Sequence, residues 1–276
     1  MSQQTWINDP ELFMRSRSDT AGHAVRAMFN KVPEVALGFW IIKIMSTTVG
    51  ETAADYLAVN VGLGTAVTGS LMAVLLGLAL ALQLRARRYV PWIYWLTVVL
   101  ISVVGTQITD ALTDGLGVSL YLSTAAFAVG LAAIFAVWFW CERTLSIQTI
   151  IGRRRELFYW AAILCTFALG TAAGDLATEA LGLGFRWGVV AFAALIAAVA
   201  VAYRLGANLV LTFWLAYILS RPLGAALGDL LTQDPTYGGL GLGAMRTSAL
   251  FLTVIAILVS VAQRRSNQAV EPLAAR

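Results

Sequence analysis

The chain has 276 residues, of which 59% are hydrophobic and only 12% charged, and its mean hydropathy is +0.77. Soluble domains carry about 25% charged residues, so this composition excludes a soluble globular protein. Continuous apolar runs of about 20 residues, the length of a membrane-spanning helix, recur along the chain, whereas a transmembrane β-barrel would show alternation. The net charge of +4 is then attributed to cytoplasmic loops, and no nucleic-acid partner is expected.

The first 30 residues are polar and mixed in charge, and they contain no apolar run typical of a cleavable signal peptide. The only histidine, His23, lies in this segment and is interpreted as a solvated interfacial residue. The two cysteines, Cys141 and Cys165, form no CxxC pair, so neither a disulfide framework nor a thiolate metal site is predicted. No cofactor is expected.

One motif, [FY]-W-x9-G-x4-D, occurs four times along the chain. Its aromatic pairs begin at Phe39, Tyr94, Tyr159 and Phe213, its glycines are Gly50, Gly105, Gly170 and Gly224, and its aspartates are Asp55, Asp110, Asp175 and Asp229. Successive aspartates are 54 to 65 residues apart, so each repeat has room for two spans.

We therefore predict an all-α membrane protein with eight transmembrane helices in four parallel two-helix repeats, the odd-numbered helices forming an inner ring. The predicted spans are 35–57, 65–84, 90–112, 118–141, 157–178, 186–204, 208–231 and 245–263. The predicted organisation is a cytoplasmic N-terminal segment (1–34), membrane half one (35–141), a basic cytoplasmic linker (142–156), membrane half two (157–263) and a cytoplasmic tail (264–276).

The distribution of basic residues predicts the orientation. Fifteen of the 19 Lys and Arg residues lie before span one or after an even-numbered span, on one predicted side of the membrane. The other side carries only Arg186 and Arg246. By the positive-inside rule both termini are expected in the cytoplasm.

The stretch KVPEVALGFWIIKIMSTTVGETAADYL (31–57) and its three echoes resemble a bacterial family of multi-pass inner-membrane proteins built from a fourfold repeat of unknown function. The resemblance extends over nearly the whole chain. It implies the bacterial cell inner membrane as the location, with membrane lipid as a partner. It implies no substrate, so the chemistry depends on the residues.

Each motif aspartate lies fifteen residues beyond the motif tryptophan, which is about 22 Å along a helix. If the aromatic pairs anchor the cytoplasmic interface, the aspartates lie in the outer half of a core about 30 Å thick. An acid at that depth costs a few kcal/mol unless it faces a cavity or a partner. A second polar position follows one turn later, near the outer mouth: Asn60, Asp114, Glu179 and Asp234.

Polar residues also precede the aspartates by one turn, at Glu51, Thr106 and Thr171, and so extend a track along one helix face. Converging carboxylates and hydroxyls would form an oxygen-lined site, and without His or Cys such a site favours Mg²⁺, Ca²⁺ or Mn²⁺. The candidate metal ligands are Asp55, Asp110, Asp175, Asp229, Glu51, Asp114 and Glu179. Alternatively, the aspartates are duplicated helix caps or solvated loop acids.

Two cations within predicted spans, Lys43 and Arg221, are candidates for gating or charge pairing. Lys43 either snorkels to the cytoplasm or remains inside the bundle. Arg221 either neutralises the aspartate of a neighbouring repeat or locks the bundle through a structural ion pair. Pro222, directly after it, favours a break in span seven.

The leading functional hypothesis is a transporter of a small cation, coupled to protons through the titration of neighbouring carboxylates. The alternatives are a proton-coupled exporter of organic cations, with the aromatic residues as cavity walls, and a structural or accessory membrane protein. No HExxH, GxSxG or Cys/His constellation is present, so no enzyme is predicted. The oligomeric state stays open, a homo-oligomer included.

Overall fold

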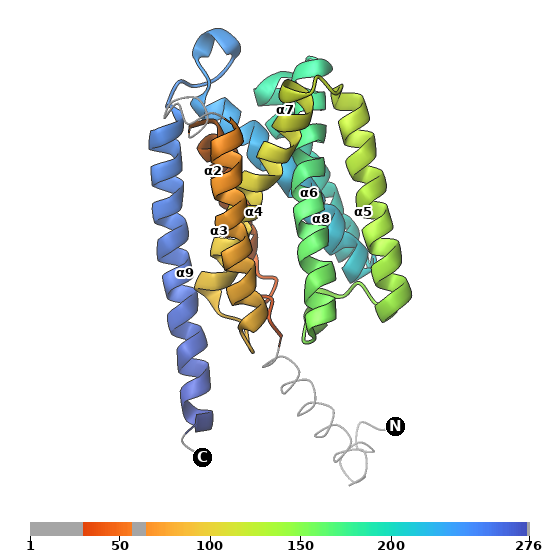
Figure 1. Cartoon of the computed structure of the whole chain (residues 1–276), viewed down its shortest axis with the longest axis vertical. Coiled ribbons are helices and arrows are strands. Elements are labelled where there is room, and N and C mark those ends of the chain that lie inside the picture. The colour runs from red at the N-terminus through yellow and green to blue at the C-terminus, as the bar shows by residue number, and fades with distance from the viewer. Residues whose placement is uncertain (1–29, 57–64, 275–276) are drawn as a thin grey trace, which may run out of the picture.

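The computed structural model describes residues 30–56 and 65–274, which contain eight α-helices (Figure 1). The helices are α2 (Leu37–Asp55), α3 (Thr65–Arg85), α4 (Pro91–Asp110), α5 (Leu120–Glu142), α6 (Arg153–Asp175), α7 (Gly184–Arg204), α8 (Leu209–Thr232) and α9 (Ala244–Ala274). Each predicted span overlaps one of them. His23, Asn60 and the side chain of Asp55 lie outside the described residues.

Length and composition mark seven of these described helices, α3 to α9, as able to cross a membrane. The remaining helix, α2, has 19 residues and carries three charged ones, Lys43, Glu51 and Asp55. The prediction of an all-α multi-pass membrane protein is therefore confirmed. Helix α2 supplies Glu51, the acid of the buried ion pair at the centre of the bundle.

Burial separates the helices into two groups. More than half of the spanning part of α4, α6 and α8 is buried, whereas less than a quarter is buried in α3, α5, α7 and α9. Helix α2 packs against α4 and α8, and α6 packs against the same two, so these four helices contact one another in a closed cycle. The other helices pack outside them: α3 on α4, α5 on α6, α7 on α8 and α9 on α2.

The motif glycines explain how the four central helices approach so closely. A Cβ atom on Gly50 would come within 3.0 Å of Ser102, and one on Gly105 would come within 3.0 Å of Phe167. The same holds for Gly170 against Arg221 and for Gly224 against Thr47. Each glycine therefore meets the residue three positions before the glycine of the next repeat, and the fourth repeat meets the first.

Replacing Gly105 by alanine is expected to lower the free energy of unfolding by about 1–3 kcal/mol, because the added methyl group overpacks a tight helix contact. Gly77 of α3 is the control, since a Cβ there has nothing within 4 Å. The Gly77→Ala variant should stay within about 1 kcal/mol of the parent. Thermal unfolding in detergent measures both. Equal stability of the two variants would contradict the close approach.

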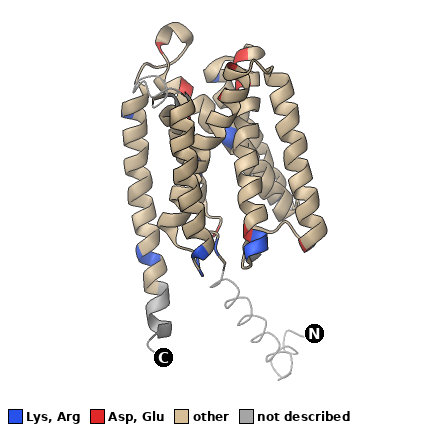
Figure 2. Cartoon of the chain, viewed as in Figure 1, with Lys and Arg blue, Asp and Glu red and all other residues tan. Residues whose placement is uncertain are grey.

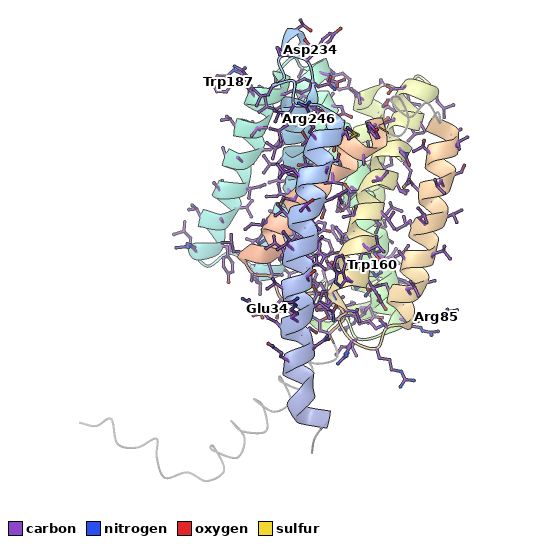
Figure 3. The ribbon with its side chains drawn as sticks, turned by 90° about the vertical axis from the view of Figure 1, so that its left-hand side faces the viewer. Glu34, Arg85, Trp160, Trp187, Asp234 and Arg246 are labelled. Atoms are coloured by element: carbon purple, nitrogen blue, oxygen red, sulfur yellow. The ribbon has the colours of Figure 1, made fainter. Side chains whose placement is uncertain are left out.

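The aromatic pairs do not lie where the sequence suggested. Trp95, Trp160 and Trp214 are buried, as is the aromatic residue before each of them, and Trp160 lies inside the bundle (Figure 3). They pack against one another between helices, for example Tyr94 against Trp160, with ring centroids 5.4 Å apart and the rings tilted. The prediction that these pairs anchor the lipid interface is wrong, because their packing partners are aromatic residues of neighbouring repeats.

Several helix ends also differ from the prediction. Helix α8 continues through Pro222, so span seven is not broken there. Helices α4 and α6 each end at the motif aspartate and continue as one π-helical turn, Ala111–Gly115 and Leu176–Ala180. Three of the four arginines of the predicted linker, Arg153 to Arg155, form the first turn of α6, and α9 extends through most of the predicted tail.

The charged residues are unevenly distributed between the two ends of the bundle. Figure 2 shows Lys and Arg on several helices at one end of the bundle, with acids among them, and this is the end where Figure 3 places Arg85. Asp234 and Arg246 lie at the opposite end. Two further basic residues, Lys43 and Arg221, are fully buried in the bundle.

Candidate functional site

The polar residues on the inner faces of α2, α4, α6 and α8 recur every four residues, counted from each motif glycine. Because a helical turn takes 3.6 residues, such residues fall on one face, and each step rises by about one turn. The structure therefore arranges them in layers that follow one another from the end that carries Arg85 toward the other end.

The first layer is a tyrosine pair. The hydroxyls of Tyr94 and Tyr159, eleven residues before their glycines, lie 2.5 Å apart, and both side chains are fully buried. Nearby, Trp95 donates its indole N–H to the hydroxyl of Tyr89 at 3.2 Å. Burial raises the pKa of Tyr89, which lies between two spans, so this hydroxyl stays neutral at physiological pH.

The second layer holds Lys43 and Tyr217, one turn further along. Lys43 is fully buried, and its Nζ lies 4.1 Å from the ring centroid of Phe167 and 4.3 Å from that of Tyr217. Neither Lys43 Nζ nor the Tyr217 hydroxyl has a hydrogen-bond partner among the described residues. The snorkelling interpretation of Lys43 is wrong, because the aromatic rings hold the amine inside the bundle.

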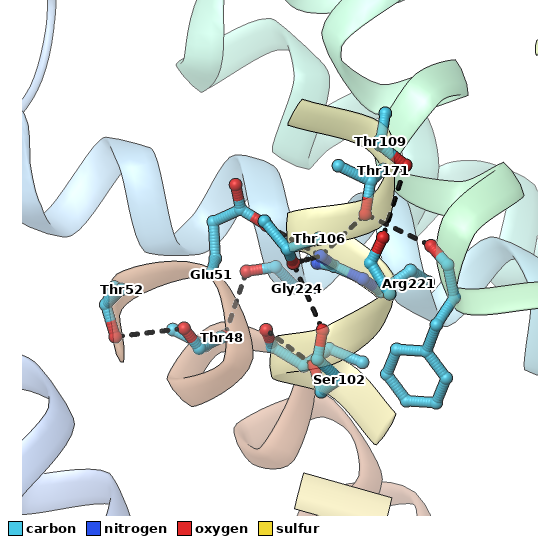
Figure 4. Close-up of polar contacts among 12 residues, drawn as sticks. Thr48, Glu51, Thr52, Ser102, Thr106, Thr109, Thr171, Arg221 and Gly224 are labelled. Carbon is cyan, nitrogen blue, oxygen red and sulfur yellow. Dashed lines mark hydrogen bonds and ion pairs between the residues drawn. The ribbon is translucent and has the colours of Figure 1, made fainter. Parts of the chain in front are cut away.

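The centre of the bundle contains a buried ion pair (Figure 4). Arg221 Nη2 donates to Glu51 Oε2 at 2.7 Å, and Arg221 is fully buried. The same nitrogen donates to the hydroxyl of Thr171 at 2.7 Å and to that of Thr106. Thr106 in turn donates to Glu51 at 3.3 Å. Four helices thus meet in one polar network.

This network follows the repeat. Glu51, Thr106 and Thr171 each directly follow the motif glycine, whereas the fourth repeat has Ala225 at that position. Arg221 lies one helical turn before Ala225 on α8, and its side chain reaches the level of Glu51, Thr106 and Thr171. All three oxygen-bearing residues belong to the predicted polar track. Of the two alternatives predicted for Arg221, a neighbouring aspartate or a structural ion pair within the bundle, the contact with Glu51 fits the second. The ion pair observed is with Glu51, the only acid among these four equivalent positions.

The motif aspartates form the next layer. Asp175 is half-buried and lies close enough to Glu51, Asp110 and Asp229 for electrostatic repulsion between the carboxylates. Asp110 and Asp229 are also half-buried. Asp55 ends α2, at the corresponding position of the first repeat.

The outermost layer consists of Asp114 and Glu179, which are exposed in the π-helical turns. The two carboxylates repel each other electrostatically. Among the residues that the structure describes, no group of three or more His, Cys, Asp or Glu is close enough to hold a metal ion. The acids thus share one end of the bundle without forming a preassembled metal centre. Phe167 and Tyr217, which hold Lys43, were not predicted, because aromatic residues are common in apolar spans.

Comparison with protein families identifies the repeat itself. The family model described as "Repeat of Unknown Function (DUF347)" matches residues 38–89, 93–144, 158–206 and 212–268. The chain belongs to this family. Each match covers one inner helix and the outer helix that follows it, so the four DUF347 repeats are the four two-helix units of the fold. Neither a curated protein nor a solved structure matches the chain.

Proposed function

We propose that this protein is a transporter of a small cation, with a divalent metal ion such as Mn²⁺, Mg²⁺ or Ca²⁺ as the substrate, coupled to protons. The proposal includes eight membrane spans, four parallel repeats around an inner ring, and a bacterial inner membrane with both termini in the cytoplasm. The observation that carries it is the buried Glu51, neutralised by Arg221 directly beneath a layer of half-buried aspartates.

In this proposal Arg221 is the internal counter-ion of an empty site. A cation that enters past Asp114 and Glu179 meets the aspartate layer and then Glu51. There it replaces the guanidinium as the positive partner of the Glu51 carboxylate. A positive partner is needed in either state, because an unpaired acid at this depth would cost several kcal/mol. Since the described acids form no metal group of three, coordination requires side chains of the aspartate layer to move inward.

A second candidate, an exporter of organic cations, is favoured by one observation. The rings of Phe167 and Tyr217 already surround an ammonium-bearing side chain, that of Lys43, in a cation–π arrangement. An organic ammonium could take the place of the lysine there. The metal substrate is preferred because the acids outnumber such aromatic positions along the proposed path.

The test is transport by the purified protein in proteoliposomes under an imposed pH gradient. Entrapped indicators report Mn²⁺, Mg²⁺ and Ca²⁺ in separate experiments, and tetraphenylphosphonium serves as the organic cation. Movement of a divalent ion above protein-free vesicles supports the proposal, and movement of tetraphenylphosphonium alone supports the second candidate. If no cation moves, the transport proposal is wrong and a structural or accessory role takes its place.

The proposed orientation predicts the accessibility of single cysteines in a background without Cys141 and Cys165. Tyr237 is exposed in the loop before α9, and Arg154 is exposed at the start of α6. In whole cells, a membrane-impermeant maleimide should label Tyr237→Cys, while Arg154→Cys should react only after the membrane is permeabilised. The opposite pattern would overturn the orientation.

A further inference from the structure

Lys43 is a buried basic group without an acidic partner in the described structure. Its amine lies against two aromatic rings and lacks a hydrogen-bond acceptor among the described residues, although it lies near the guanidinium of Arg221. We propose that Lys43 is the group that binds and releases the proton exchanged for the transported cation. This inference rests on the proposed transport function and assigns its coupling residue.

Opposing interactions leave both protonation states of Lys43 accessible. Each aromatic ring stabilises an ammonium through a cation–π interaction. The absence of a hydrogen-bond acceptor among the described residues and the nearby guanidinium of Arg221, which lies over the same Phe167 ring, oppose the ammonium. Among the described residues, the groups recorded against the Lys43 amine are the neutral side chains of Phe167 from α6 and Tyr217 from α8. The neutral tyrosine pair of α4 and α6 follows one turn away.

The ion pair connects Lys43 to the substrate. While Glu51 neutralises Arg221, the pair presents little net charge to Lys43, and the ammonium is tolerated. When a cation binds Glu51 in place of Arg221, the guanidinium loses its counter-ion and repels the Lys43 ammonium more strongly. Cation binding therefore promotes proton release from Lys43, and by linkage protonation of Lys43 promotes cation release. The result is exchange of a cation for a proton.

Hydroxyl groups lead from Lys43 toward the basic end of the bundle. Tyr217 shares the layer of Lys43 and has no hydrogen-bond partner among the described residues, and Tyr94 and Tyr159 follow one turn away. The proton leaves Nζ, which keeps the electron pair as a neutral amine. For exchange, this released proton leaves toward the end where the cation enters, and water at the basic end supplies the replacement proton once the cation has been released. Along the tyrosine path each hydroxyl accepts one proton and passes on its own, and the amine takes the last, so the tyrosines are unchanged. Because neither Nζ nor the Tyr217 hydroxyl has a hydrogen-bond partner among the described residues, a water molecule must bridge these steps.

The test measures proton and cation movement together, with entrapped pyranine beside the cation indicator. Lys43→Met should lose at least about tenfold of the cation-dependent proton movement, yet retain exchange of internal for external cation without a pH gradient. Lys43→Arg keeps a positive charge that cannot be lost, so it should also fail to couple, whereas a packing role for Lys43 would be rescued by arginine.

Two tyrosine variants complete the experiment if the Lys43 variants fold poorly. Tyr217→Phe removes only a hydroxyl and should slow coupled proton movement severalfold, whereas Tyr203→Phe on the exposed face of α7 should not. If the parent protein exchanges cations for protons and all these variants do so equally well, Lys43 is not the coupling residue. If the parent moves no cation, the proposed function fails first, and the inference fails with it.

Discussion

Replacing Glu51 by glutamine is expected to lower the free energy of unfolding by about 3–5 kcal/mol, because the substitution leaves the fully buried Arg221 without its anion. Glutamine keeps the size of the side chain and can still accept hydrogen bonds, so the change isolates the loss of charge. Arg221→Met should cost a similar amount, since Glu51 is then the buried charge without a partner.

The double variant Glu51→Gln/Arg221→Met tests whether the two side chains stabilise the bundle as a pair. Because no buried charge remains, it should recover most of the stability lost in either single variant. Glu142→Gln is the matched control. Glu142 pairs with Arg154 and Arg155 at the basic end, where the arginines are partly exposed, so its loss should cost less than about 1 kcal/mol.

Thermal unfolding in detergent, with all four variants measured under one condition, gives the comparison. A cost for Glu51→Gln no larger than that for Glu142→Gln would show that another group compensates Arg221. A double variant as unstable as the sum of the singles would show that the pair is not energetically coupled. Either result would remove the central ion pair from the transport proposal.

The sequence predicted the parts of the fold that depend on composition and repetition. Apolar runs located the helices, and the motif located the four inner ones, because duplication copies one packing solution around the bundle. The polar track was predicted because residues four apart share a helix face. The sequence alone therefore predicts that Glu51, Thr106 and Thr171 lie on one track.

The interactions between repeats were not predictable in the same way. A tryptophan in an apolar span fits a lipid interface as well as a protein core, and only the partner helices decide that Trp95 and Trp160 are buried. The partner of Arg221 depends on where its long side chain extends within the ring, which periodicity does not determine. Pro222 does not break α8, and its ring instead packs near Gly170 of α6.

The second large effect concerns transport. Asp175→Asn and Asp110→Asn are each expected to reduce cation transport by at least about tenfold, a loss equivalent to about 1.4 kcal/mol or more of cation binding. Asparagine keeps the size and hydrogen bonding of the side chain but removes the charge that attracts the cation. Asp175 should be the more sensitive, because the charges of Glu51, Asp110 and Asp229 all reach it.

The Asp→Asn variants separate a binding role from a structural one when transport and unfolding are measured on the same preparations. Asp110 and Asp175 are half-buried at the ends of α4 and α6, so a parent-like unfolding temperature with lost transport identifies a role in the cation path. Asp234→Asn is the control, because that side chain is exposed and caps Thr236, as asparagine also does. It should transport like the parent. If Asp110→Asn and Asp175→Asn also transport like the parent, the carboxylate path is wrong, since a cation crossing this layer would have to pass both acids without using their charge.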